Sequence, residues 1–322
     1  MLKTTIIAHP IQGLIKYHGL RKPRERIPYH DSISVCVEAL TTTTTVETID
    51  RRREDEFVVN GTKVTGQDRE RMETVLRKLK SLADFRGGFR VASENSLRVG
   101  KGLGFSASGF AALGLAASGS LGLDLDETRL SEVVRLGAGS STRSLVGGFA
   151  IWYADKSGRS YAEQLSWPER MDFYMVIVPI HSELKTDEAH VEVLSSPLFK
   201  ARCRNIRKML GDMKQAIIKG DTATVGRLAE EDTLNLHAIT MTGKSHMLLW
   251  EPDTIRVIRE LATEKKKGVQ AWYSIDTGPS VFINTFKENS KAIAERLEGI
   301  GFKDVIISGI GGNPFSTGNH LF

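Results

Sequence analysis

A run of small residues in the first half of the chain restricts the fold more than any other feature. Between Ser108 and Leu123 nearly every residue is Gly, Ala, Ser or Leu. A helix with such short side chains lets its neighbours approach closely, so we expect it inside a packed domain. The run is too short and too rich in small residues to span a bilayer, so no membrane association is expected.

The segments around this helix predict a sheet in the first half of the chain. Strand character, with β-branched or alternating residues, occurs at 4–8, 32–37, 41–46, 89–92 and 147–153. Asn60-Gly61 supplies the turn of a hairpin over 56–64. Hydrophobic residues spaced by three and four predict an amphipathic helix over 67–83, and a second helix is expected over 126–136.

The pattern changes in the second half. Helices are predicted at 198–218, 222–237 and 253–265, and strands at 173–178, 271–274, 280–284 and 305–309. We therefore expect an α+β fold of two domains, residues 1–168 and 169–322, with a boundary near Trp167-Pro168.

Composition excludes several classes of protein. The 322 residues are 40% hydrophobic and 26% charged, as in ordinary globular proteins. Two cysteines, Cys36 and Cys203, argue against a disulfide framework and favour a reducing cytoplasm; no signal peptide is visible. The eight histidines lack metal-ligand spacing, so no metal site is expected. The net charge of +5 suits anionic small molecules and nucleic acid equally.

A glycine-rich loop precedes the small-residue helix. Glycines allow a phosphate to approach the backbone, and a helix start directs free amides and a positive dipole end at it. The candidate phosphate-binding residues are Lys101, Gly102, Gly104, Ser106, Ala107 and Ser108. A plain loop-to-helix connection is an equally common explanation, and the spacing of a P-loop is lacking.

Three other segments carry chemistry. Arg143 lies among hydroxyls and glycines, and its planar fork can clamp a carboxylate. Lys16 follows an apolar run, and Asp276 stands in an Asp-Thr-Gly-Pro sequence. Each has an ordinary explanation when taken alone: a structural ion pair, a surface lysine and a turn-capping carboxylate.

Taken together and in order, these segments resemble the diphosphomevalonate decarboxylases, members of the GHMP kinase superfamily. The family carries Ile-Lys-Tyr-Trp-Gly-Lys where this chain has Ile15 to Leu20, and Gly-Leu-Ala-Ser-Ser-Ala-Ala-Gly where it has Gly102 to Gly109. Its Ser-Ala-Cys-Arg-Ser-Leu-Tyr-Gly-Gly-Phe aligns with Ser140 to Phe149. Further matches fall at Asp232 to Ala238 and Ile275 to Pro279.

The resemblance implies a ribosomal protein S5 domain 2-like N-terminal domain, a ferredoxin-like C-terminal domain and an active site between them. It implies that Arg143 holds the substrate C1 carboxylate, that Asp276 faces C3 and its oxygen, and that Lys16 pairs with Asp276 and keeps it ionised. The expected substrate-binding residues are Tyr17, His18, Ser140, Ser141, Thr142 and Lys185. Family members are commonly dimers, which makes a homodimer an expectation.

Departures from the family concern the substrate. Phe105 replaces a serine of the phosphate loop, and Lys185 and His190 stand where the family has a hydroxyl-rich phosphate-binding segment. Arg98 and Lys101 add cations beside the loop. The phosphate-binding segments have thus lost hydroxyls and gained cations at other positions. The substrate that we expect is therefore mevalonate 3,5-bisphosphate, converted to isopentenyl phosphate without ATP as in relatives from some archaea.

Two alternatives stay open. One is an ATP-dependent decarboxylase of mevalonate 5-diphosphate or 5-phosphate, with ATP and Mg²⁺. The other is an RNA-binding module of the S5-like type, which scattered basic residues without interleaved aromatics make the weaker hypothesis. Retention of Asp276 argues against the 3-kinase relatives, in which this aspartate is replaced.

Overall fold

A computed structural model describes residues 2–50, 54–98, 102–182 and 186–322. The largest sheet has the strand order β16-β1-β6-β9-β7-β8. Its neighbours are antiparallel except for β7 and β9, which run parallel. Its strands are β1 (Lys3–Ala8), β6 (Thr42–Ile49), β7 (Glu56–Val59), β8 (Thr62–Lys63), β9 (Gly88–Asn95) and β16 (Phe315–Thr317).

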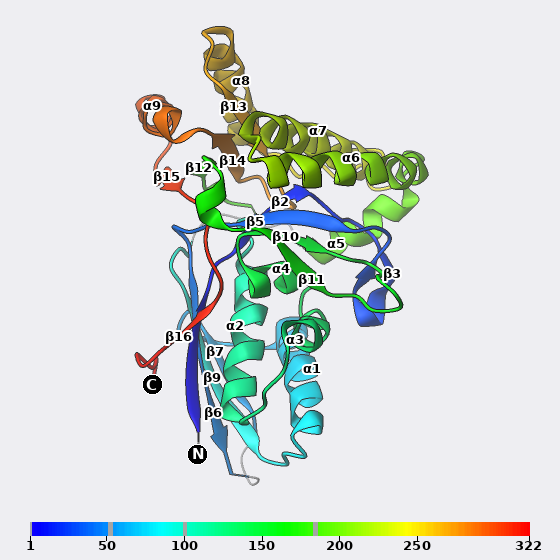
Figure 1. Ribbon diagram of the computed structural model, residues 1–322, viewed down its shortest axis with the longest axis vertical. Helices are drawn as coiled ribbons and strands as arrows, with labels where there is room; N and C mark the ends of the chain where they lie inside the picture. The colour runs from blue at the N-terminus through cyan, green and yellow to red at the C-terminus, as the bar shows by residue number, and fades with distance from the viewer. Residues whose placement is uncertain (1, 51–53, 99–101, 183–185) are drawn as a thin grey trace.

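Helices cover one face of this sheet, and the small-residue helix lies against its centre (Figure 1). The helices are α1 (Gly66–Leu82), α2 (Phe105–Ser120) and α3 (Glu127–Val134). Ala111, Ala112 and Ala116 of α2 are fully buried in a core shared with α1 and the sheet. Short side chains therefore allow the close packing that the sequence predicts.

A second sheet, in the order β11-β10-β5-β2, separates this layer from the rest of the molecule (Figure 1). Its strands are β2 (Ile11–Ile15), β5 (Ser32–Cys36), β10 (Phe149–Trp152) and β11 (Ala162–Ser166), and the short helix α4 (Ser141–Val146) packs on it. A small hairpin of β3 (Leu20–Lys22) and β4 (Ile27–Pro28) projects beyond it.

The second half of the chain forms a sheet in the order β13-β14-β12-β15, with helices around it. The strands are β12 (Tyr174–Val178), β13 (Ala271–Ser274), β14 (Val281–Thr285) and β15 (Ile306–Ser308). The helices are α5 (Thr186–Glu192), α6 (Phe199–Lys219), α7 (Thr222–Met241), α8 (Pro252–Lys266) and α9 (Lys287–Gly299).

The two halves share a hydrophobic core. One buried cluster joins Phe149 of β10 to Phe173, whose rings meet edge to face at 5.5 Å, and extends to Phe282 of β14. At the end of the chain, β16 returns to pair with β1 of the first sheet. The α+β class is confirmed, whereas the division at residue 168 stays a prediction.

Most predicted elements lie within a few residues of their expected positions. The Asn60-Gly61 turn has positive φ at both residues, 50° and 78°, as a type I′ turn requires. Within the described ranges, no helix combines the length and apolar character needed to cross a membrane.

Candidate active site

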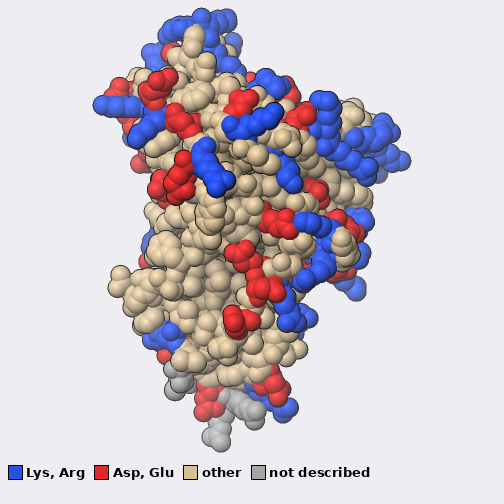
Figure 2. All heavy atoms as spheres, viewed as in Figure 1, with Lys and Arg blue, Asp and Glu red and all other residues tan. Residues whose placement is uncertain are grey.

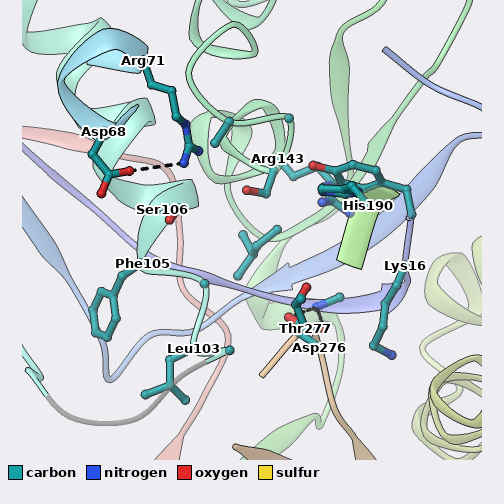
Figure 3. A pocket seen from close by; sticks show the side chains of 18 of the residues that line it. Lys16, Asp68, Arg71, Leu103, Phe105, Ser106, Arg143, His190, Asp276 and Thr277 are labelled. Atoms are coloured by element: carbon teal, nitrogen blue, oxygen red, sulfur yellow. Dashed lines mark hydrogen bonds and ion pairs between the residues drawn. The ribbon is translucent and has the colours of Figure 1, made fainter. Parts of the chain in front are cut away.

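A cavity of about 650 Å³ opens between the phosphate-loop end of α2, the start of α4 and the segment that follows β13. Figure 3 shows Arg143 and Asp276 pointing into it from different elements. Lys16, His190 and Thr277 lie toward the Asp276 side, and Leu103, Phe105 and Ser106 lie toward the other (Figure 3). All four segments that the sequence singles out, including the one with Lys16, therefore contribute to this cavity.

Arg143 lies on α4 with only 3% of its surface exposed. Its guanidinium carbon is 5.6 Å from the centre of the Tyr17 ring and 6.0 Å from that of Trp152. Within the described part of the chain, its Nε and Nη1 have no hydrogen-bond partner. Buried unpaired donors at a cavity wall suit an anionic ligand such as a carboxylate.

Asp276 follows β13 and accepts a hydrogen bond from the backbone N–H of Gly13, at 3.1 Å to each carboxylate oxygen. Burial raises the pKa of Asp276 to about 6, while the charge of Lys16 and the Gly13 N–H oppose the shift. The carboxylate is therefore largely ionised at neutral pH inside a cavity that disfavours charge.

Lys16 follows β2 directly, and its ammonium is buried. Its Nζ lies 3.6 Å from Oδ2 of Asp232 and donates to the Thr233 hydroxyl at 2.9 Å. The expected direct pair with Asp276 is therefore wrong in its geometry: the ion pair is made with Asp232, and Lys16 acts on Asp276 through space. Burial lowers the pKa of Lys16, and both carboxylates raise it.

Gly13 of β2 separates these two side chains. A Cβ at this position would lie 2.8 Å from Oδ1 of Asp276 and 2.8 Å from Cγ of Lys16. Since real side chains do not tolerate such contacts, only glycine allows the carboxylate to reach the backbone amide. No motif in the sequence points to this residue.

Part of the expected phosphate loop lines the cavity. Gly102 and Gly104 line the cavity with φ of 79° and 76°, and a Cβ on either would collide with the backbone of Gly278 or Ile11. Ser106 also lines the cavity. Lys101 lies outside the described residues.

Two predicted phosphate ligands are corrected. The amide of Ala107 donates to the Gly104 carbonyl, and its side chain is fully buried. The hydroxyl of Ser108 is 2.7 Å from that of Thr42 and fully buried. Both residues face the interior because α2 turns them away from the cavity within its first turn.

The substrate-binding predictions at α4 divide in the same way. Ser140 lines the cavity beside Arg143. The hydroxyls of Ser141 and Thr142 instead donate to the carbonyls of Ala138 and Gly139, at 2.6 and 2.9 Å, and both residues are fully buried. They stabilise the start of α4 rather than line the cavity, so this prediction is corrected.

Aromatic and imidazole rings form the wall beside Asp276. His18 lies 3.1 Å from the Thr277 hydroxyl through Nε2, and its ring is 5.1 Å from that of His190. The ring of Tyr17 stacks on His190 at 5.2 Å. Burial lowers the pKa of His18 well below its usual value, so the ring is neutral. Lys185, predicted to contribute here, lies outside the described residues.

Several lining residues were missed by the sequence analysis. Arg26 reaches the cavity from the β3–β4 hairpin, with a left-handed backbone at φ 53°. It stands in a basic stretch in which no spacing distinguishes one arginine from another. Six polar residues and one leucine form a part of the cavity that we call the distal arm, which lies beside the start of α1: Asn60, Thr65, Gln67, Asp68, Arg71, Asn95 and Leu97.

Phe105 packs partly against the shared core and also borders the cavity. In Figure 3 its ring points away from Arg143 and Asp276. Phe105 therefore borders the cavity without facing the reaction centre. Among the described residues, no cluster of His, Cys, Asp or Glu side chains has the arrangement of a metal site.

Comparisons with known proteins agree with the geometry. Residues 8–162 match the diphosphomevalonate decarboxylase-like N-terminal domain, and residues 186–305 match the mevalonate 5-diphosphate decarboxylase C-terminal domain. The phosphomevalonate decarboxylase of Haloferax volcanii is 38% identical over 97% of this chain and 96% of its own length.

Solved structures show the same fold. The mevalonate diphosphate decarboxylase of Staphylococcus aureus has a TM-score of 0.91 at 28% identity, covering 98% of each chain. MDDEF in complex with MVAPP, AMPPCP and magnesium also has a TM-score of 0.91, at 26% identity, over 98% of this chain and 99% of that one. With its two matching domains and its cavity, this chain belongs to the diphosphomevalonate decarboxylase family of the GHMP kinase superfamily.

Proposed function

We propose that this chain decarboxylates a phosphorylated mevalonate to an alkene, with phosphate as the group that leaves C3. The observation that carries the proposal is that Arg143 and Asp276 share one cavity, in which a buried cation with unpaired donors faces a buried carboxylate. Membership in a family of decarboxylases supports the same reaction.

The chemistry follows from charge. As the C3–O bond to phosphate breaks, positive charge develops at C3, and the fixed carboxylate of Asp276 stabilises it. The C1–C2 bond then breaks, its electron pair forms the C2=C3 bond, and CO2 leaves. Arg143 orients the departing carboxylate, and the positive charge of Lys16 keeps Asp276 ionised.

The phosphate on C5 would bind beside Tyr17 and His18. The β3–β4 hairpin supplies Arg26 as a cation to this cavity. The lysine that ends the family motif Ile-Lys-Tyr-Trp-Gly-Lys is replaced by Leu20 in this chain. A single arginine fork suits one phosphate group, and the relative from Haloferax volcanii is named for a monophosphate. We therefore favour a 5-monophosphate over a 5-diphosphate.

The distal arm bears on the source of the C3 phosphate. Its amide and hydroxyl side chains, with Leu97, resemble the mixed lining that holds a nucleotide base and ribose, and the cavity has room for a second ligand. These features support mevalonate 5-phosphate with ATP as co-substrate, which would donate the phosphoryl group to the C3 oxygen. The bisphosphate route without ATP is the second candidate, favoured by Phe105 in place of a loop serine and by Arg98 on the cavity wall.

The distribution of surface charge does not support the RNA-binding alternative. Figure 2 shows acidic residues interspersed with basic ones over the face drawn, with basic residues most concentrated near the ends of helices in the second half. A homodimer and a cytoplasmic location stay predictions.

A direct assay separates the two routes. Purified protein is given mevalonate 5-phosphate with ATP and Mg²⁺, or mevalonate 3,5-bisphosphate without nucleotide, and CO2 and isopentenyl phosphate are measured. We expect release with the first mixture. Release with the bisphosphate alone would favour the second candidate. If neither mixture releases CO2, and mevalonate 5-diphosphate does not either, the proposed decarboxylase function is refuted.

Asp276→Asn should fold normally and lose turnover by about 10²-fold or more, because the amide cannot stabilise positive charge at C3. CO2 release under saturating substrate measures the effect. Asp212→Asn, which changes an exposed carboxylate on α6, is the matched control and should retain activity. Substantial turnover by Asp276→Asn would contradict the role of this carboxylate.

The pH dependence of kcat/KM should report the ionisation of Asp276 in the free enzyme. Because the pKa of Asp276 is raised to about 6, the active carboxylate form is lost as the pH falls through that value, and kcat/KM should fall with it. Lys16→Met removes the charge that lowers this pKa, so the acid limb should move to higher pH. Lys208→Met, on an exposed lysine of α6, should leave it in place.

Arg26→Gln should raise the KM for mevalonate 5-phosphate about tenfold with little change in kcat, since it removes one charge-assisted contact to a non-reacting phosphate. Arg24→Gln, an exposed position of the same hairpin, is the control. Equal KM values for the two variants would place the C5 phosphate elsewhere.

A further inference from the structure

A buried ion network lies behind Lys16. The side chain of Arg202 on α6 donates through Nη2 to Oδ1 of Asp232 at 2.8 Å and to the backbone carbonyl of Lys16 at 2.7 Å. The other oxygen of Asp232, on α7, accepts the backbone N–H of Lys16 at 2.9 Å and lies 3.6 Å from its ammonium. The side chains of Asp232 and Arg202 are 0% and 1% exposed.

This network fixes Lys16 at three points: its N–H, its carbonyl and its ammonium. Lys16 lines the cavity, whereas Asp232 and Arg202 are absent from its described lining. The network also joins the two halves of the chain, since Lys16 follows β2 and the other two residues belong to α6 and α7.

We propose that Asp232 and Arg202 are positioning residues, which hold the Lys16 ammonium charged and beside Asp276. The inference rests on the proposed function, because it assigns a task to Lys16 in that reaction. Neither residue would touch substrate; both act through Lys16.

Charge balance supports the assignment. A lone buried ammonium tends to lose its proton, and the carboxylate of Asp232 counteracts that tendency. Arg202 in turn compensates the charge of Asp232, which would otherwise oppose ionisation of Asp276. The other titratable groups that face Lys16 are His18 and His237, and burial lowers the pKa of both rings, that of His237 to about 3.

A buried ion pair is weak evidence for stability, because desolvation offsets the attraction between the charges. The ion pair between Asp232 and Arg202 instead fixes the position of the Lys16 ammonium. Oδ1 of Asp232 is held by Arg202, so Oδ2 is directed at Lys16. A shift of the ammonium by about 1 Å is enough to cost about 10²-fold in rate where charge stabilisation is involved.

The test compares Asp232→Asn with Glu231→Gln, its neighbour on the same helix, whose side chain is half-exposed and pairs with Arg227. With mevalonate 5-phosphate and ATP, or whichever phosphorylated mevalonate the wild type uses, Asp232→Asn should lower kcat by about 10²-fold with KM nearly unchanged. The alkaline limb of its kcat profile should move to lower pH, because the Lys16 ammonium loses the carboxylate whose negative charge favours its protonated form.

Two further variants separate charge from packing. Asp232→Glu keeps the charge and should keep the wild-type alkaline limb even where kcat falls. Arg202→Lys also keeps its charge but loses the fork that holds the Lys16 carbonyl, so it should lower kcat without raising KM. Arg202→Lys carries the test if Asp232→Asn does not fold, as judged by circular dichroism.

The outcomes distinguish this inference from the proposed function. An active wild type in which Asp232→Asn matches Glu231→Gln in kcat and pH profile overturns the inference and leaves the function standing. The same holds if Arg202→Lys retains full kcat. A wild type that decarboxylates no phosphorylated mevalonate overturns both.

Discussion

The site depends on an ionised carboxylate kept out of water. Asp276 is buried, and burial alone favours its neutral form, which could not stabilise positive charge on a substrate carbon. The surroundings restore the charge with a backbone N–H from Gly13 and the nearby ammonium of Lys16. In the reaction that we propose, the group that stabilises charge at C3 is a carboxylate whose own ionisation is opposed by burial.

This requirement explains the arrangement of the two halves. Asp276 follows β13 in the sheet of the second half, whereas Gly13 lies in β2 and Lys16 directly after it in the first half. Packing the halves against each other through a common hydrophobic core brings the Gly13 N–H within hydrogen-bonding distance of Asp276 and places the Lys16 charge close enough to act on it through space. The reaction centre, where Asp276 shares the cavity with Arg143, is thus a product of tertiary packing between the two halves.

Much of the fold could be predicted from the sequence, because periodicity and turn chemistry are local. The hairpin at Asn60-Gly61 and the small-residue helix α2 are examples. α4 was missed, since its residues favour loops and caps, and only burial against α2 and β10 stabilises six residues as a helix. The pairing of β16 with β1 was also missed. β16 has only three residues and lies far from β1 in the sequence, so no local pattern indicates that the two strands pair.

The site was predicted less completely. A motif indicates which segment approaches a ligand but not which side of a helix faces it. Ser140 and Ser106 therefore line the cavity, whereas Ser141 and Ser108, in the same motifs, are turned inward. Lys16 lines the cavity, but its direct partner is Asp232 and not the expected Asp276, since both are acidic and only the packing of α7 decides between them.

The return of β16 to the first sheet has a consequence for biosynthesis. β16 pairs with β1 through residues 315–317, and the two ends of the described chain lie near each other in Figure 1. On the ribosome, β1 emerges first, yet its outer neighbour emerges only after α9 and β15. Until then one edge of β1 stays open to other chains, so the nascent protein depends on late closure, or on a chaperone, to protect that edge from aggregation.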